Sequence, residues 1–236
     1  MASAAQQLEE LHPSLWRASQ LARSVTRCID TGHPALSKQL VGGGWPTGSL
    51  TELMVERPGV GEWRLLAPAL AQVAHRKIVL IEPPHLPHAI ALAGLGIDIG
   101  NVLWIKSKVS ADALFAAETV LRSSSCGSVL LWANHIRQES LRRLHLAAQA
   151  GENLFYIIRP IASAQDASPS PLRLTVRPAS GGISIGFIKR RGPQSDGELF
   201  LPLEGNLISR RRITPVQVDP VAQPLSAAHR LAVTER

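Results

Sequence analysis

The sequence predicts an α/β fold in which a mostly parallel sheet is flanked by helices and followed by a C-terminal antiparallel hairpin. Three observations predict this class. Short runs rich in Val, Ile and Leu, typical of strands buried on both faces, alternate with helix-like segments of about 10 to 14 residues. The last two strand-like runs have no helix between them. Apolar residues make up 45% of the 236-residue chain, which is enough for a packed core.

The first expected element is an amphipathic helix at residues 14–29, within an N-terminal region that we assign to residues 1–35. Pro13 ends any helix before it, and Ser14 can cap the helix that follows. Apolar residues recur every three or four positions, as on one face of a helix: Leu15, Ala18, Ala22, Val25 and Ile29. The helix either packs on its own domain or docks on a neighbouring protein.

A core domain is expected at residues 36–192. Its expected strands are 49–55, 77–82, 101–106, 128–133, 153–158, 172–178 and 183–191. Its expected helices are 62–75, about 87–95, 111–122 and 139–150. The first five strands are separated by helices, so we expect them to be parallel. The last two strands are expected to form the hairpin.

Residues 193–236 are predicted to be a flexible, basic, Pro-rich C-terminal arm. The density of Pro, Gln, Ser and charge rises after Gly192. The stretch PVQVDPVAQP cannot form a helix, because proline removes a helical hydrogen bond and clashes with the preceding turn. Such a composition is typical of a segment without a core of its own.

Composition narrows the class of protein. The chain has 25 Lys and Arg against 18 Asp and Glu, a net charge of +7 that favours polyanionic partners such as nucleic acid. No apolar run approaches the ~20 residues that span a bilayer, and no secretory signal is evident, so we expect a cytoplasmic protein without a membrane partner.

Cys28 and Cys126 are expected to be free, buried thiols. His85 and His88 have no third ligand nearby, so no metal site is expected.

The most informative motif is the turn after the expected strand 49–55. A strand, a glycine-containing turn and a helix are the layout of a phosphate-binding loop, G-x-x-x-x-G-K-S/T. Laid on that pattern, the residues are ERPGVGEW, from Glu56 to Trp63, with Gly59 inside the turn. Only Gly61 matches a required residue. Glu62 takes the place of the lysine, and Trp63 takes the place of the hydroxyl residue.

These replacements remove the groups that bind a nucleotide in such a loop. The lysine neutralises the β and γ phosphates, and the hydroxyl holds Mg²⁺. A carboxylate ~4 Å from a phosphate charge costs about 4 kcal/mol at an effective dielectric near 20, whereas the start of a helix attracts an anion by up to ~2 kcal/mol. We therefore interpret this loop as degenerate and expect no hydrolysis, no catalytic residue and no cofactor. A residual nucleotide site that uses other contacts stays open.

Longer stretches resemble the core of the RecA recombinase family. They include GGGWPTGSLTELMVERPGVGEW, KIVLIEPPHLPHAIALAGLGIDIGNVLWI, GSVLLWANHI and FIKRRGP, and together they cover about residues 36–193. In that family the Mg-binding strand ends in Asp, and the general base is a Glu just after the second strand. This chain has Trp132, Ala133 and Asn134 at the first place and Pro84 at the second, although Glu82 falls on a neighbouring acid. The resemblance implies a RecA-like core without ATPase activity.

Within this superfamily the chain resembles the ImuA family of translesion DNA synthesis-associated proteins. The segment ENLFYIIRP and the Ser-rich loop after it are similar to both the ImuA and the SulA groups, whereas the long arm is an ImuA feature. The resemblance implies a non-catalytic accessory protein of SOS-induced mutagenesis. Its implied partners are a Y-family-like polymerase subunit of the ImuB type, an error-prone replicative-type polymerase and RecA. The alternative is a SulA-like cell-division inhibitor that binds the division tubulin.

Two basic triplets are the candidate contacts to a partner or to DNA. They are Lys189, Arg190 and Arg191 at the end of the last core strand, and Arg210, Arg211 and Arg212 in the arm. Such runs are either solvated surface charge or sites that bind phosphates or acidic protein. The RecA resemblance implies that the positions of Lys189 and Arg191 reach across a subunit boundary toward a neighbour's ATP.

Overall fold

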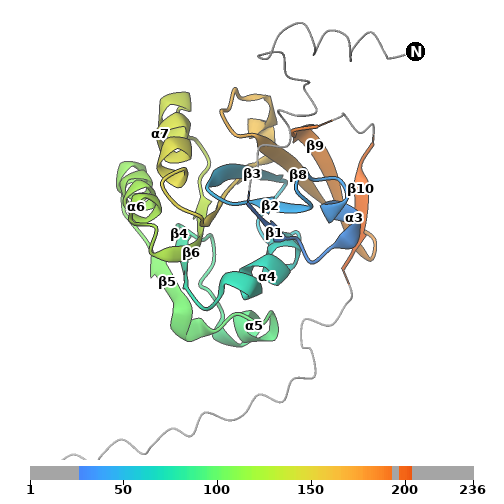
Figure 1. Cartoon of the computed structure of the whole chain (residues 1–236), viewed down its shortest axis with the longest axis horizontal. Helices are drawn as coiled ribbons and strands as arrows, with labels where there is room; N and C mark the ends of the chain where they lie inside the picture. The colour runs from blue at the N-terminus through green and yellow to red at the C-terminus, as the bar shows by residue number, and fades with distance from the viewer. Residues whose placement is uncertain (1–26, 193–196, 204–236) are drawn as a thin grey trace, which may run out of the picture.

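A computed structural model of the chain describes residues 27–192 and 197–203. It shows an eight-stranded mixed sheet with helices on both faces (Figure 1). The predicted α/β class, the mostly parallel sheet and the antiparallel hairpin are confirmed. Residues 204–236, which hold most of the predicted C-terminal arm, lie outside the described residues.

The elements follow the predicted alternation of strands and helices. The strands are β1 (Cys28–Asp30), β2 (Gly44–Pro46), β3 (Ser49–Val55), β4 (Lys77–Ile81), β5 (Val102–Ile105), β6 (Cys126–Trp132), β7 (Leu154–Pro160), β8 (Leu172–Ala179), β9 (Gly182–Lys189) and β10 (Leu199–Pro202). The α-helices are α3 (Pro34–Ser37), α4 (Glu62–Val73), α5 (Ala89–Gly94), α6 (Ser110–Ser123) and α7 (Gln138–Ala148). Two 3-10 helices, η1 (Ile99–Asn101) and η2 (Ile161–Gln165), precede β5 and follow β7.

The strand order across the sheet is β10-β9-β8-β3-β7-β6-β4-β5. The strands from β8 to β5 are parallel, and β9 and β10 are antiparallel to their neighbours. The carboxyl ends of β3, β4, β6 and β7 therefore meet along one edge, which we call the carboxyl edge. The opposite edge, where these strands begin, is the amino edge.

The core lies in two layers, one on each face of the sheet. On one face, Leu65, Leu66 and Leu70 of α4 belong to a core cluster that includes residues of β3, β4 and β6. On the other face, α6 and α7 lie side by side and bury Ala117, Leu121 and other small or aliphatic residues (Figure 1). Every residue of β3 and β6 is buried, including the polar Ser49, Thr51 and Glu52 of β3.

A buried ion network links the three central strands. Glu52, in the middle of β3, is 0% exposed. Its carboxylate accepts hydrogen bonds from Arg159 of β7 at 3.0 Å and from Arg173 of β8 at 2.8 Å. Arg159 also pairs with Asp166 at 2.7 Å, and Arg173 donates to the carbonyl of Ser163 at 3.0 Å. The buried carboxylate is thus compensated by two cations, as a charge removed from water requires.

Two of the sequence predictions need correction, and α3 and β2 were not predicted at all. The predicted helix 14–29 is wrong at its end, because Cys28 and Ile29 belong to β1, which pairs with β2. The rest of that helix lies outside the described residues. Residues 199–202, which we assigned to the arm, form β10 and pair with β9. Neither cysteine forms a disulfide, and Cys126 is buried as predicted, but Cys28 is only half-buried. Burial raises the pKa of both thiols.

The longest helix in the described part of the chain, α6, has 14 residues. None of the helices described there could cross a bilayer.

Candidate functional site

Residues 56–63, called here the 56–63 loop, join β3 to α4 at the carboxyl edge. Gly59 and Gly61 have φ angles of +88° and +129°, which favour glycine because it has no Cβ. Gly61 caps α4, and its carbonyl accepts from the amide of Leu65 at 2.9 Å. The chain therefore follows the strand–turn–helix path that the sequence predicted for this segment.

The side chain of Glu62 folds back into the 56–63 loop. Its Oε1 accepts a hydrogen bond from the amide of Gly59 at 2.7 Å, and its Oε2 accepts one from the amide of Gly61 at 3.1 Å. Glu62 is only 2% exposed. A carboxylate at the first turn of a helix also interacts favourably with the helix dipole. Two backbone donors, of the kind that such a loop offers to a phosphate, are thus bonded to an internal carboxylate.

Trp63, the next residue, packs against Trp132 at the end of β6. The two ring centroids lie 5.6 Å apart with the planes tilted by 32°. The resemblance relates β6 to the Mg-binding strand, and the residues after it are Ala133 and Asn134, without a carboxylate. This aromatic contact joins the start of α4 to the end of β6, where the RecA family holds its metal.

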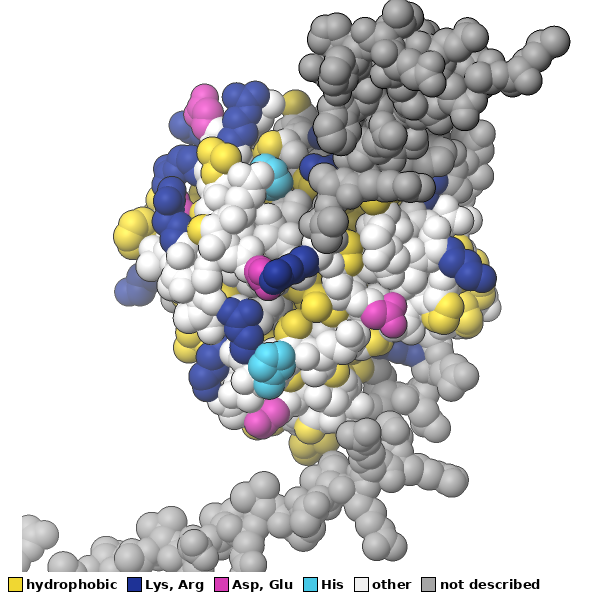
Figure 2. Space-filling model, in the orientation of Figure 1, with side chains coloured by type: hydrophobic (Ala, Val, Ile, Leu, Met, Phe, Trp, Pro, Cys, Tyr) yellow, Lys and Arg dark blue, Asp and Glu magenta, His cyan; other side chains and the backbone are white. Residues whose placement is uncertain are grey.

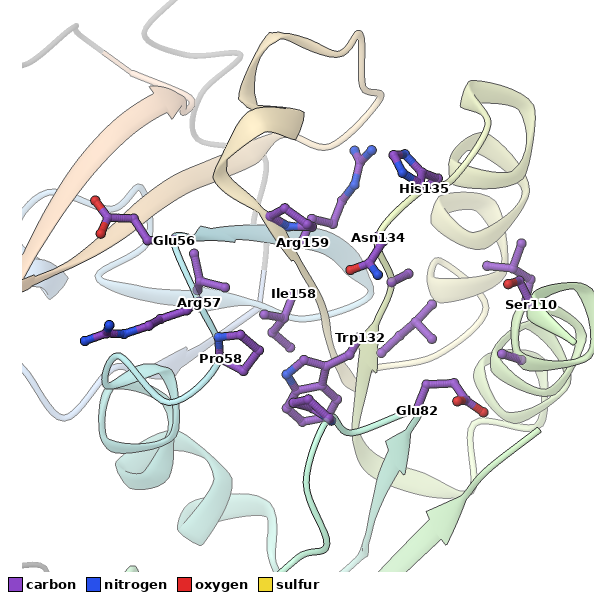
Figure 3. A pocket seen from close by; sticks show the side chains of 17 residues that line it. Glu56, Arg57, Pro58, Glu82, Ser110, Trp132, Asn134, His135, Ile158 and Arg159 are labelled. Carbon is purple, nitrogen blue, oxygen red and sulfur yellow. The ribbon is translucent and has the colours of Figure 1, made fainter. Parts of the chain in front are cut away.

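A cavity of about 490 Å³ opens at the carboxyl edge, beside the 56–63 loop. Ligands of open α/β sheets bind at this edge. Figure 3 shows labelled side chains around it that come from several strand ends, including Pro58, Trp132, Asn134 and Ile158. Glu82 also lines the cavity, and its carboxylate accepts from the Ser107 hydroxyl at 2.9 Å and from the Ser107 amide.

A second cavity of about 300 Å³ lies between the 56–63 loop and the Pro-rich segment before α5. His85 and His88 line it together with apolar residues such as Trp63 and Leu95. His88 caps α5, because its Nδ1 accepts from the amide of Ala91 at 3.4 Å. Within residues 27–192 and 197–203, no group of three or more His, Cys, Asp or Glu residues is placed to hold a metal ion.

The triplet Lys189–Arg191 lies at the amino edge, away from the 56–63 loop. Lys189 is exposed and donates to the Ser168 carbonyl at 3.2 Å. Arg190 is half-buried, with hydrogen bonds to Gln39 at 2.6 and 2.8 Å and its guanidinium 4.9 Å from the centre of the Phe187 ring. Arg191 is exposed. Arg190 is therefore a structural contact, whereas Lys189 and Arg191 present charge at the surface.

The second triplet, Arg210 to Arg212, lies outside the described residues. The 56–63 loop and the first triplet do not form one site. β9 runs antiparallel to β8, so the triplet at its end lies at the amino edge, whereas the loop lies at the carboxyl edge.

His145 of α7 lies within the field of the first triplet and was not found from the sequence. Its Nδ1 accepts a hydrogen bond from the amide of Leu50 at 3.3 Å, so that nitrogen carries no proton. Burial lowers the pKa of His145, and the charges of Arg191 and Lys189 lower it further. The sequence shows only a histidine near the end of an amphipathic helix, which carries no such signal.

A further basic surface runs along α6 and α7 (Figure 2). Arg137 and Arg142 are exposed there. Arg122 and Arg143 both pair with Glu118 of α6 and hold the pKa of its carboxyl below the ordinary value, with Arg143 the larger cause. Part of this basic surface is therefore neutralised within the protein.

The fold and the loop define a mostly parallel α/β protein with a phosphate-loop-like turn that its own glutamate fills. No protein-family model matches the chain. A curated cell division inhibitor SulA from Edwardsiella piscicida is 30% identical over 98 residues. The aligned stretch is 41% of this chain and 58% of that relative, so the chain spans little more than half of the length of the relative that it matches.

Proposed function

We propose that this protein is a non-catalytic accessory factor of SOS-induced translesion DNA synthesis, which acts by binding other proteins. The observation that carries the non-catalytic part is the position of Glu62. Its buried carboxylate bonds the amides of Gly59 and Gly61. A triphosphate entering this loop would have to displace that carboxylate and would still lie next to its negative charge.

The aromatic contact between Trp63 and Trp132 supports the same proposal. It places an apolar pair between the loop and β6, where a hydrolysing enzyme of the RecA family needs a hydroxyl and a carboxylate for Mg²⁺. Glu82 is the acid closest in sequence to Pro84, which stands at the position of the family's general base. Its carboxylate accepts a hydrogen bond from Ser107. On this proposal the loop serves as a fixed part of the fold.

The test of this part is ATP binding and hydrolysis by the full chain, with and without single-stranded DNA. We expect no turnover above background, because Glu62, Trp63 and Pro84 replace the groups that the reaction needs. A DNA-stimulated turnover that is abolished by Glu62→Ala would contradict the proposal. Active RecA under the same conditions is the positive control.

The partners of the proposed factor follow from the ImuA resemblance. They are an ImuB-type Y-family-like polymerase subunit, an error-prone replicative-type polymerase and RecA, with DNA contact through the basic clusters. The exposed Lys189 and Arg191 support contact with a RecA neighbour, because they lie at the amino edge and are not part of the filled loop. A subunit with one competent face cannot propagate a filament, so it would cap a RecA filament end.

Filament growth tests the capping role. We expect substoichiometric inhibition of RecA filament growth, relieved by the double change Lys189→Glu and Arg191→Glu. Glu62→Ala, at the other edge, is the matched control and is expected to change little. Inhibition that needs one copy per RecA subunit, or that survives the double change, would rule out capping through this face.

The second candidate function is a SulA-like inhibitor of cell division. The 30% identity to a protein of that name over 98 residues favours it. Affinity capture of the tagged chain from DNA-damaged cells separates the two candidates. Polymerase subunits and RecA in the captured material support the first function, and division tubulin supports the second. Purified partners must then reproduce the same interaction.

A further inference from the structure

The edge strand β5 exposes large apolar side chains on both of its faces. Among the described strands it pairs only with β4, so its outer side has no neighbouring strand (Figure 1). Leu103 is 47% exposed and Trp104 is 40% exposed. Successive side chains of a strand point to opposite faces of the sheet. Both faces are therefore uncovered at this position.

More exposed apolar residues belong to the same corner of the molecule, formed by the Pro-rich segment, α5, η1 and β5. Of the ten exposed large apolar residues in the described part of the chain, five fall between residues 86 and 104: Leu86, Ile90, Ile99, Leu103 and Trp104. Single exposed apolar residues are common in soluble proteins, whereas concentrations of them mark interaction sites. This concentration therefore indicates a surface that a binding partner covers.

The backbone of β5 offers hydrogen bonds in the outward direction. The carbonyl of Ile105 faces β4, because it accepts from the amide of Glu82 at 3.0 Å. The N–H and C=O groups of one residue in a strand point to the same side, and those of the next residue point to the other. The N–H and C=O groups of Trp104 therefore face away from β4, as a strand-adding partner requires.

The charged residues beside the outer side of β5 favour an acidic binding partner. Lys106 and Lys108 follow β5 and are exposed. Lys77, at the start of β4, donates to the carbonyl of Gly100 at 2.9 Å. Asp98 is close by in sequence, but its carboxylate accepts from the amide of Gly100 at 2.9 Å. The lysines after the strand remain available for carboxylates of a partner.

A second copy of this chain fits the edge less well. β5 has four residues, and pairing two such strands would bury less than the ~1,000 Å² that a specific interface needs. Lysines beside an edge also discourage edge-to-edge pairing of identical chains. An extended segment from another protein can continue past β5 over the neighbouring apolar residues, which a two-fold contact between short strands cannot do.

We propose that the outer edge of β5 binds an extended, acidic segment of a partner protein by β-strand addition. The backbone of Trp104 pairs with the added strand, and apolar side chains of that strand contact Leu103 and Trp104 on the two faces. Carboxylates of the segment pair with Lys106 and Lys108. This inference depends on the edge alone, and it holds whether or not the protein has the function proposed above.

The probe for this test is a short fluorescein-labelled peptide in which valine and glutamate alternate, with a valine–lysine peptide as its control. Binding to the full chain is measured by fluorescence anisotropy, and amide hydrogen exchange is measured with and without the probe. We expect the acidic peptide to bind and to slow exchange at the amide of Trp104. The basic peptide is expected not to bind.

Three variants localise the binding. Trp104→Pro removes the outward N–H and should abolish binding of the acidic peptide. The double change Lys106→Glu and Lys108→Glu should weaken it roughly tenfold, since it replaces two attractions by two repulsions. Phe200→Ala, at the exposed position of the other edge strand β10, is the matched control and should leave binding unchanged.

The results that overturn the proposal are also defined. They are no binding of the acidic peptide to the parent, or binding that the double lysine change leaves unaltered. If Trp104→Pro does not fold, as judged by circular dichroism, the lysine pair and the exchange at Trp104 decide. Protection of the Trp104 amide without peptide, together with a dimer in sedimentation, would assign the edge to a second copy and also overturn the proposal.

Discussion

Replacing Glu62 by alanine tests the part that its carboxylate plays in the 56–63 loop. The change removes two hydrogen bonds to a charged group, each of which contributes about 1.5–3 kcal/mol. It also relieves part of the cost of keeping a carboxylate buried, which offsets part of this loss. The amides of Gly59 and Gly61 can then bind water. We expect a net loss of about 2 kcal/mol, which lowers the melting temperature of a domain of this size by about 4–8 °C.

The specific part of this prediction is rescue by an anion. Without the carboxylate, the two amides at the start of α4 form an anion site of the kind that helix N-termini provide. Inorganic phosphate should then stabilise the variant, by ~2.7 kcal/mol at a concentration one hundred times its dissociation constant. The parent should respond much less, because the carboxylate of Glu62 already accepts from both amides.

The assay is thermal unfolding across a phosphate titration at constant ionic strength. Glu62→Gln keeps an acceptor oxygen without the charge, so it should lose less stability than Glu62→Ala. Glu56→Ala removes an exposed glutamate from the same loop and should stay within about 0.5 kcal/mol of the parent. Equal stability of Glu62→Ala and the parent, or an equal response of both to phosphate, would refute the reasoning.

Three further predictions concern the core and the amino edge. Glu52→Ala removes the buried carboxylate that pairs with Arg159 and Arg173, so it should lower the free energy of unfolding in urea by about 3–5 kcal/mol. A decrease below about 1 kcal/mol would contradict the importance of this network. Truncation after residue 203 should leave the melting temperature of the parent unchanged. Truncation after residue 192 also removes β10 and should lower the melting temperature, and equal melting temperatures of the two truncated chains would contradict this prediction. Because the pKa of His145 is lowered by folding, the stability tied to its neutral form should fall as the pH drops below about 6.5. The fall should be smaller in His145→Gln, and an identical pH dependence of the urea midpoint would contradict it.

Most of the sheet could be predicted because its strands carry their own signal. A strand buried on both faces is rich in apolar residues, and β4 and β6 show this in the runs IVLI and VLLW. The helices α6 and α7, which precede and follow β6 in the chain, differ from the predicted bounds by one or two residues. Their periodic apolar faces match the layer that they cover on the sheet.

The elements that were missed depend on contacts distant in sequence. The four residues of β10, LFLP, are apolar but too few to mark a strand by their pattern, and they form one because β9 offers them an edge. In β1, Ile29 extends the apolar spacing of the preceding segment, and its pairing with Trp45 of β2 overrides that pattern. Periodicity measures only local preference, so it cannot report either pairing.

The candidate site was only half predictable for the same reason. The sequence identified Glu62 as a charge that repels phosphate, which follows from residue type and position in the motif. It could not show that the carboxylate bonds the amides of Gly59 and Gly61, because that depends on the backbone path through the two glycines. Glu52 was not singled out at all, since its arginine partners lie 107 and 121 residues further along the chain.

The contrast between the two edges of the sheet bears on how the proposed factor would be controlled. A loop that binds the phosphates of a nucleotide has those groups only while the nucleotide is bound. Here the carboxylate of Glu62 accepts hydrogen bonds from the loop amides of Gly59 and Gly61. Because Glu62 is part of the chain, this anion is always present. A ligand can shift an equilibrium only by binding one state better than another, so a loop with a permanent internal anion offers ATP little to act on. On our proposal, the exposed Lys189 and Arg191 at the amino edge are presented to partners continuously. Partner binding would then be set by how much of the protein is made, which suits a factor whose synthesis follows DNA damage.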